Sequence, residues 1–165
     1  MRLLKLIFAT LLGLTAANWA FIYLAPESAT RVILDAERRY AGLERKEIVL
    51  PDGLRYVYLE GGGTGDAGRR EPLLLLHGFG ANKDNFVRVA RHLVPHYRVI
   101  IPDHIGFGES SHPPEADYAP LAQAERLHRL AQALGIRRVH IGGSSMGGRI
   151  ALSYAARYPT EVASL

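Results

Sequence analysis

The hydrophobic pattern opens on one long apolar run, Leu6–Ala25, which contains no charged residue over 20 positions. At about 1.5 Å of rise per residue, a helix of that length spans roughly 30 Å, the thickness of a bilayer's hydrocarbon layer. Trp19 and Tyr23 lie near its far end, and amphipathic rings of this kind favour the membrane interface. We therefore predict that residues 1–25 form a transmembrane anchor.

Two other structures remain compatible with this run. A cleaved signal peptide has a shorter apolar core and a small-residue cleavage site, for which Thr15–Ala17 is a poor candidate. A buried helix of a soluble domain is the second alternative. Basic residues flank both ends, so the side of the membrane on which the rest of the chain lies is not determined. These residues are Arg2, Lys5, Arg31, Arg38 and Arg39.

The next segment, residues 26–43, is amphipathic. Pro26 ends the apolar run, Glu27 and Ser28 can cap a new helix, and Gly42 ends it. The apolar positions of this helix recur at helical spacing with charges between them, and they are Val32, Ile33, Ala36 and Tyr40. We predict a linker helix between the anchor and the body of the protein. It could instead lie on the lipid surface.

The hydrophobic period changes from helical to strand-like after Glu44. Lys46–Leu50 and Leu54–Leu59 are predicted strands, and Pro51–Gly53 between them indicates a hairpin turn. Gly61–Gly65 is predicted to be a flexible loop. No Lys-Ser or Lys-Thr pair and no helix follows these glycines, so they do not indicate a phosphate-binding loop.

From residue 72 onward, predicted strands and helices alternate. The strands are Pro72–Leu76, Tyr97–Ile101 and Arg138–Ile141, and the helices are Asp84–Leu93, Leu121–Leu134 and Met146–Tyr158. Continuous apolar strands that alternate with helices imply right-handed βαβ units and a mainly parallel sheet with flanking helices. Residues 45–165 are therefore expected to form an α/β domain.

The sharpest chemical signal is Ser145, which lies in a Gly-x-Ser-x-Gly pattern between a predicted strand and a predicted helix. A sharp strand-to-helix turn exposes such a serine as a nucleophile, and it requires small residues two positions before and after, here Gly143 and Gly147. The alternatives are an idle serine in a glycine-rich turn, and Ser144 as the nucleophile. Ser144 lacks the symmetric glycines.

A second motif, at the end of the strand Pro72–Leu76, can supply an oxyanion hole. Gly78 and Gly80 allow its backbone to turn in closely. We assign the backbone N–H groups of Phe79 and Met146 as the two donors to a substrate oxyanion. His77 could be a general base, but its place on this loop favours a structural role.

A third motif, Asp103–Ser110, follows the next strand. Asp103 could be a catalytic acid, although a carboxylate that organises the loop is the preferred interpretation. The seven histidines show no helical pairing typical of a metal site, and neither a metal nor another cofactor is expected.

Composition excludes several classes of protein. The chain has no cysteine, which removes disulfides, thiol catalysis and a lipidated cysteine. The net charge of +4 includes no basic run, so nucleic-acid binding is not expected. The arginine pairs are interpreted as solvated surface, and they are Arg38–Arg39, Arg69–Arg70 and Arg137–Arg138.

Together, His77–Asp84, Asp103–Ser110 and Gly143–Gly148 resemble the α/β-hydrolase superfamily, in particular the monoacylglycerol-lipase-like branch that includes membrane-anchored bacterial lipases. The resemblance covers residues 45–165. A serine at position 145 argues against the haloalkane-dehalogenase and epoxide-hydrolase branches, which place an aspartate there.

The resemblance implies a lipase or carboxylesterase that forms an acyl-enzyme on Ser145 and acts on lipid-like esters. A carbon–carbon bond hydrolase and a non-catalytic anchored protein are the alternatives. The oligomeric state is not determined.

In this family the triad acid and histidine follow the nucleophile in chain order. Leu165 lies only 20 residues beyond Ser145, so both are expected to be absent from this chain. We expect an inactive N-terminal fragment, truncated after the nucleophile helix. We also expect the strand Arg138–Ile141 to have an unpaired edge, and residues 26–165 alone to be insoluble or molten.

Overall fold

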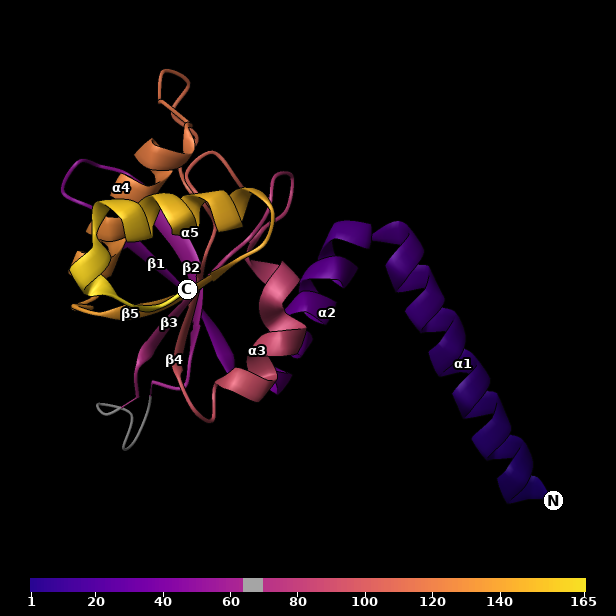
Figure 1. Cartoon of the computed structure of the whole chain (residues 1–165). Coiled ribbons are helices and arrows are strands. Elements are labelled where there is room, and N and C mark those ends of the chain that lie inside the picture. The colour runs from indigo at the N-terminus through magenta and orange to yellow at the C-terminus, as the bar shows by residue number, and fades with distance from the viewer. Residues whose placement is uncertain (64–69) are drawn as a thin grey trace. The chain divides into compact units, whose positions relative to one another are not determined.

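The computed structural model describes residues 1–63 and 70–165 (Figure 1). The chain divides into two compact units, Met1–Glu37 and Arg38–Leu165, and each is described by itself.

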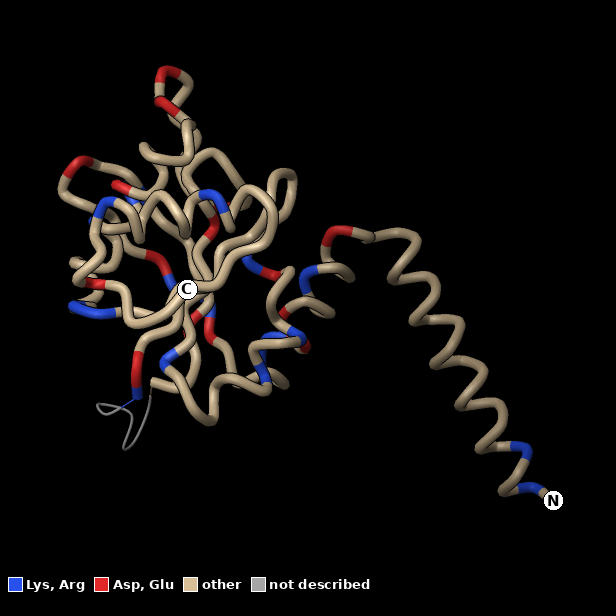
Figure 2. Tube along the Cα trace, in the orientation of Figure 1, with Lys and Arg blue, Asp and Glu red and all other residues tan. Residues whose placement is uncertain are grey.

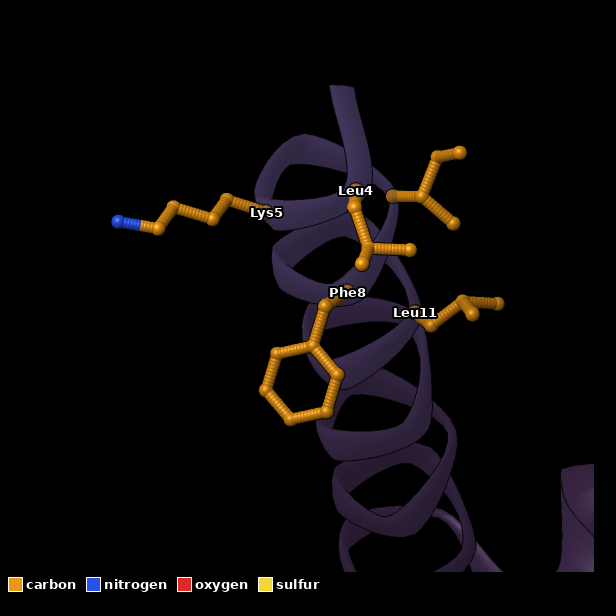
Figure 3. Close-up of a pocket in the computed structure, with 5 residues that line it drawn as sticks. Leu4, Lys5, Phe8 and Leu11 are labelled. Carbon is orange, nitrogen blue, oxygen red and sulfur yellow. The ribbon is translucent and has the colours of Figure 1, made fainter. Parts of the chain in front are cut away.

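The N-terminal unit is helical. Helix α1 (Arg2–Leu24) has no buried residue, and helix α2 (Pro26–Tyr40) begins two residues after it ends. Figure 2 shows charge on α1 only near its N-terminal end. Figure 3 shows Leu4, Phe8 and Leu11 pointing outward from this helix, on the walls of a shallow hollow. Within the described part of the chain, α1 is the one helix long and apolar enough to cross a membrane.

The C-terminal unit contains a six-stranded sheet with helices between its later strands. The strands are β1 (Leu43–Val49), β2 (Arg55–Gly61), β3 (Pro72–Leu76), β4 (Arg98–Pro102), β5 (Val139–Gly143) and β6 (Val162–Ser164). The helices are α3 (Val87–Leu93), α4 (Pro120–Ala133) and α5 (Met146–Arg157), with short 3₁₀ helices η2 (Lys83–Phe86) and η3 (Pro159–Glu161).

The strand order is β1-β2-β4-β3-β5-β6. β1 and β2 form an antiparallel hairpin, β2 is antiparallel to β4, and the pairs β3–β4, β3–β5 and β5–β6 are parallel. The chain therefore passes from β3 to β4 on one side and then to β5 on the other side of β3. Such a reversal opens a crevice at the carboxyl ends of the strands, where ligands bind in open α/β sheets.

Apolar clusters cover both faces of the sheet because side chains alternate along each strand. On one face, Leu74 and Leu76 pack with α4 and α5 through residues such as Leu127 and Ile150. On the other face, Leu75 packs with α3, together with side chains from β2 and β4. These clusters hold β3 from both faces, and the first of them also holds β5 through Val139 and Ile141.

The order and type of the predicted elements are confirmed, and most bounds shift by one or two residues, more at the starts of α1 and β1. The helix predicted from Asp84 is divided into η2 and α3. Gly61 belongs to β2, while Thr64 and Gly65 of the predicted glycine loop lie outside the described residues.

The prediction that β5 has an unpaired edge is wrong for the first half of this strand. Val139 pairs with Val162 and His140 with Ser164, because the segment after α5 returns as strand β6.

The interpretation of the arginine pairs as solvated surface also needs correction. Arg137 and Arg138 are exposed, but the side chain of Arg38 is buried. Arg70 donates hydrogen bonds to the carbonyl oxygens of Gly62 and Val94, and its neighbour Arg69 lies outside the described residues. Each guanidinium has several fixed donors, so it can be held inside the structure where acceptors converge on it.

Candidate active site

Ser145 occupies the turn between β5 and α5 in a strained backbone conformation. Its φ is 53° and its ψ is −116°, and no other described residue except glycine has a positive φ. Such a conformation costs on the order of 1–3 kcal/mol and persists only where the surroundings enforce it. The side chain is exposed, so the turn presents its hydroxyl to the space beyond the sheet.

The glycines around Ser145 allow the backbone to pack too closely for any side chain. A Cβ atom on Gly143 would lie 2.4 Å from the carbonyl carbon of Gly147. A Cβ on Gly147 would lie 2.0 Å from the carbonyl oxygen of Leu76, on the neighbouring strand. Gly148, one position later, has room for a methyl group, with 3.4 Å to the nearest atom. The turn therefore needs glycine at the two positions that the sequence pattern indicates.

The loop after β3 passes directly beside the serine. A Cβ built on Gly78 would lie 3.4 Å from the Cβ of Ser145 and 4.0 Å from its Oγ. The backbone N–H groups of Phe79, next in this loop, and of Met146 have no hydrogen-bond partner among the described residues. The two predicted oxyanion donors therefore belong to the segments that flank the Ser145 hydroxyl.

His77 is buried, and both of its ring nitrogens are engaged. Nδ1 lies 2.8 Å from the carbonyl oxygen of Gly78, and Nε2 accepts a hydrogen bond of 3.1 Å from the backbone N–H of His104. This arrangement requires the neutral tautomer with its proton on Nδ1. Burial lowers the pKa of His77, which also keeps the ring neutral. These contacts support a structural role and leave no nitrogen for a general base.

His104 lies against His77, with ring centroids 4.4 Å apart and Nε2 3.3 Å from the carbonyl oxygen of His77. Burial, followed by repulsion from His77, lowers the pKa of His104 to about 3. The ring of Phe107 in the same loop makes edge contacts with His77 and with Phe79, at 5.7 Å in each case. The loop after β4 therefore forms the surface against which the loop after β3 packs.

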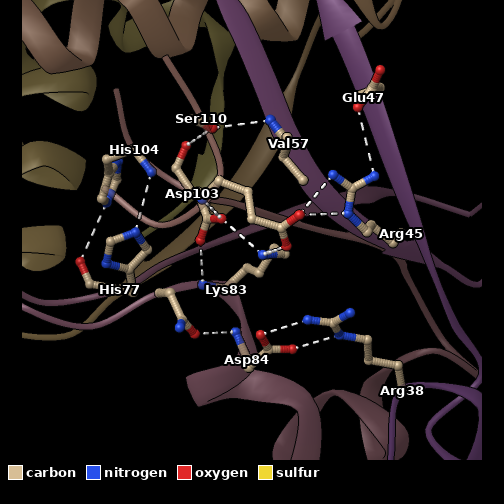
Figure 4. A network of polar contacts seen from close by, with 12 residues as sticks. Arg38, Arg45, Glu47, Val57, His77, Lys83, Asp84, Asp103, His104 and Ser110 are labelled. Atoms are coloured by element: carbon tan, nitrogen blue, oxygen red, sulfur yellow. Dashed lines mark hydrogen bonds and ion pairs between the residues drawn. The ribbon is translucent and has the colours of Figure 1, made fainter. Parts of the chain in front are cut away.

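Asp103 is fully buried, and its carboxylate is occupied by loop donors (Figure 4). The backbone N–H of Lys83 donates to Oδ1 at 2.7 Å, and the Lys83 ammonium and the backbone N–H of Glu109 donate to Oδ2, each at 2.8 Å. A Cβ on Gly108, where φ is +55°, would lie 2.2 Å from this carboxyl group. The geometry supports the interpretation that Asp103 organises the loop and is not a catalytic acid.

Sequence reasoning did not single out Lys83, Glu109 or the ion pair between Arg38 and Asp84. Arg38 donates two hydrogen bonds to the Asp84 carboxylate, each 2.7 Å long, and both side chains are nearly buried. Lys83 and Asp84 are adjacent and look like solvated charges in the sequence. Only the fold reveals that both are paired on opposite sides of the same short helix.

Among the described residues, no histidine or carboxylate makes a hydrogen bond with the Ser145 hydroxyl. The His–carboxylate pairs among the described residues are His128–Glu161 and His140–Glu71. His140 pairs in register with Leu73, near the amino end of β3, while Ser145 lies beyond the carboxyl end of β5. The described residues also contain no group of three His, Asp or Glu side chains that could hold a metal ion.

Comparison with known sequences identifies the class of protein. The sequence pattern of the α/β-hydrolase fold family matches residues 71–165, and the chain belongs to this family.

Two similar relatives are named lipases. Lipase 1 of Psychrobacter immobilis is 48% identical, over 100% of this chain and 51% of that protein. Lipase 3 of Moraxella sp. (strain TA144) is 50% identical, over 84% of this chain and 42% of that protein. The chain thus spans about half the length of the curated relatives it matches.

The chain also superposes on solved structures, again over about half of their length. A membrane phospholipase A, described as a bacterial virulence factor, superposes with a TM-score of 0.75 at 42% identity, over 98% of this chain and 50% of that one. A solved structure from Acinetobacter baumannii AYE gives a TM-score of 0.74 at 41% identity, over 80% of this chain and 43% of that one.

Proposed function

We propose that this protein is a serine hydrolase that cleaves carboxylic esters of lipid-like substrates, with Ser145 as its nucleophile. The observation that carries the proposal is the strained turn at Ser145, enforced by glycine contacts that leave no room for side chains. The names of the relatives, two lipases and a membrane phospholipase A, support an ester bond in a lipid as the target.

In the proposed mechanism, the Ser145 hydroxyl attacks the ester carbonyl carbon, and the carbonyl oxygen becomes an oxyanion. The N–H groups of Phe79 and Met146 donate to that oxygen, and the positive end of helix α5 adds to its stabilisation. A histidine that follows the nucleophile in chain order, as this fold implies, takes the serine proton and passes it to the leaving alcohol. Water then hydrolyses the acyl-enzyme by the same route.

We further propose that residues 1–25 anchor the protein in a membrane and that residues 26–43 connect this anchor to the hydrolase domain, residues 45–165. The length and apolar surface of α1 support the anchor. On α2, Val32 and Ile33 are 60% and 54% exposed, so part of its apolar stripe is available to lipid. An anchor of this kind would hold the active site where lipid esters partition.

A fluorophosphonate probe tests the nucleophile, because it phosphonylates activated serines. In the protein expressed from its own gene, we expect labelling that Ser145→Ala abolishes and that Ser144→Ala leaves largely intact. Hydrolysis of a monoacylglycerol should fall on the order of 10⁴-fold or more in Ser145→Ala. Equal labelling of wild type and Ser145→Ala would exclude Ser145 as the nucleophile.

The membrane anchor needs a separate experiment, because a cleaved signal peptide has a similar pattern. We expect the protein to stay with membranes after alkaline carbonate washing and to retain its N-terminal residues in intact-mass measurement. Release of a shortened protein into the soluble fraction would show a cleaved signal instead.

A further inference from the structure

Lys83 is a buried lysine at the start of η2. It directly follows the loop after β3, residues 77–82, which carries the Phe79 N–H and is called the oxyanion loop below. It is 1% exposed, and its ammonium lies 2.8 Å from Oδ2 of Asp103 and 2.6 Å from Oε1 of Glu109. Lysine is almost never fully buried unless it is paired. Two carboxylates of the loop after β4 thus hold one residue of the loop after β3, across 20 and 26 positions of the sequence.

Lys83 is held at its backbone as well as at its side chain. Its N–H donates to Oδ1 of Asp103 at 2.7 Å while its ammonium donates to Oδ2 of the same carboxylate. A residue bound at both ends to one rigid group can neither slide nor rotate relative to it. The position of the Lys83 backbone is therefore set by the loop after β4, which also carries the ring of Phe107 against Phe79.

Glu109 extends the network to the hairpin. Oε2 of Glu109 accepts a hydrogen bond of 2.9 Å from Nε of Arg45 on β1, and Nη2 of the same guanidinium lies 2.7 Å from it in an ion pair. Burial opposes ionisation of Glu109, but the hydrogen bonds from Arg45 and Lys83 outweigh it and lower its pKa to about 2. Two cations, Arg45 and Lys83, and two carboxylates, Asp103 and Glu109, are therefore in contact at this point.

A short and internally bonded turn connects Lys83 to the oxyanion donor. Phe79 lies four positions before Lys83, and the N–H of Ala81 donates to the carbonyl oxygen of Gly78 at 3.3 Å. The Asn82 side chain caps η2 by accepting a hydrogen bond of 2.9 Å from the N–H of Asp84. Little slack remains between the two residues, so a shift at Lys83 reaches the N–H of Phe79.

We propose that Lys83 is a positioning residue for catalysis: clamped by Asp103 and Glu109, it sets the place of the Phe79 N–H in the oxyanion hole. Lys83 itself does not touch the substrate. The inference rests on the proposed function, because it assigns the Phe79 N–H to the oxyanion. A misplacement of about 1 Å at such a donor is enough to lower the rate on the order of 100-fold.

The test compares Lys83→Met with Lys46→Met in the protein expressed from its own gene. Lys46 is a matched control, because its ammonium also binds a carboxylate, Glu60 at 3.0 Å, but on the hairpin. With a monoacylglycerol substrate, we expect Lys83→Met to lower kcat about 30- to 100-fold while KM changes less than about threefold. The rate of fluorophosphonate inactivation should fall in parallel, and Lys46→Met should stay within about twofold of wild type.

The completeness of labelling separates positioning from a general structural role. A misplaced Phe79 N–H weakens stabilisation of the oxyanion, so the rate of fluorophosphonate labelling falls but every folded molecule is labelled in the end. A general structural role would instead reduce the fraction of Lys83→Met that is labelled at completion. A folded Lys83→Met with the kcat and the labelling rate of Lys46→Met would overturn the proposal.

A second variant keeps the test decisive if Lys83→Met does not fold. The Glu109 side chain is 44% exposed, so Glu109→Gln retains its shape at little cost to folding. We expect kcat to fall about three- to tenfold at an unchanged KM. An unchanged kcat would refute the clamp.

The two proposals can fail separately. Labelling that survives Ser145→Ala removes the proposed function and this inference with it, whereas loss of labelling in Ser145→Ala together with a wild-type kcat in Lys83→Met removes the inference alone.

Discussion

The two segments that flank the Ser145 hydroxyl are held in place by opposite means. The turn from β5 to α5 depends on missing side chains, since backbone atoms occupy the space where a Cβ would stand on Gly143 or Gly147. The end of the oxyanion loop depends on charged side chains, since Lys83 and Asp84 are each bound by ionic partners. One segment is therefore sensitive to added volume, and the other to lost charge.

The largest expected effect comes from adding volume to the turn. Gly147→Ala should destabilise the fold by more than about 3 kcal/mol, because its methyl group would stand 2.0 Å from the carbonyl oxygen of Leu76. Gly148→Ala, in the same helix but with 3.4 Å of clearance, should cost less than about 1 kcal/mol. Urea unfolding followed by circular dichroism measures both, and similar midpoints would contradict the steric account.

Removing charge beside the oxyanion loop should have the next largest effect. Asp84→Asn removes the carboxylate charge that the nearly buried Arg38 guanidinium contacts at 2.7 Å and should cost about 2–4 kcal/mol. Glu125→Gln is the matched control, because its partner Arg157 is 3.8 Å away and both side chains are largely exposed. That change should cost less than about 0.5 kcal/mol. Equal losses in the two variants would show that the Arg38–Asp84 pair contributes no more than surface charge.

The buried contact between His77 and His104 predicts that the free energy of unfolding depends on pH. His104 ionises at about 3 in the folded chain and near 6.5 when unfolded, so the unfolded state binds the extra proton between these values. Stability should therefore fall as the pH drops below 6.5, by about 2 kcal/mol at pH 5. His104→Phe should weaken this dependence while it keeps the packing against His77. Unfolding midpoints at pH 8 and pH 5 measure it, and an unchanged difference in the variant would exclude His104 as its source.

The smallest expected effect is a gain in the stability of the fold. Ser145→Gly relieves the positive φ and should stabilise the fold by about 0.5–1 kcal/mol, although activity is lost. Ser144→Gly, next to it without a positive φ, should destabilise by a similar amount because glycine adds freedom to the unfolded chain. Thermal melts of both variants give the sign, and a loss of stability in Ser145→Gly would contradict the strain at this residue.

The contrast between the glycine turn at Ser145 and the charged contacts of Lys83 and Asp84 explains what could be predicted from the sequence. The turn at Ser145 is local, so its spacing of glycines and its place between a strand and a helix are visible in five consecutive residues. The strands β3 to β5 and their helices were also predictable, because burial on one or both faces leaves a periodic pattern. The expected place of the strand Arg138–Ile141 next to a sheet edge came from the resemblance to a known family.

The ionic contacts of Lys83 and Arg38 left no such pattern. Arg38 reaches Asp84 across 46 positions, and Lys83 reaches Asp103 across 20. Charged residues are usually solvated, so their burial depends on which strands become neighbours in the sheet. The pairing of β5 with β6 was missed for a related reason: a strand of three residues is too short to show a period.

The oxyanion loop is fixed at both ends, at His77 and at Lys83, and this has a consequence for adaptation. Between these points, the Phe79 side chain is 81% exposed and belongs to neither anchor. Substitutions at Phe79 would alter the surface beside Ser145, the proposed nucleophile, and leave the Phe79 backbone N–H in place. If the proposed function holds, a library of variants at this one position should change which esters are preferred more than the rate with the preferred ester.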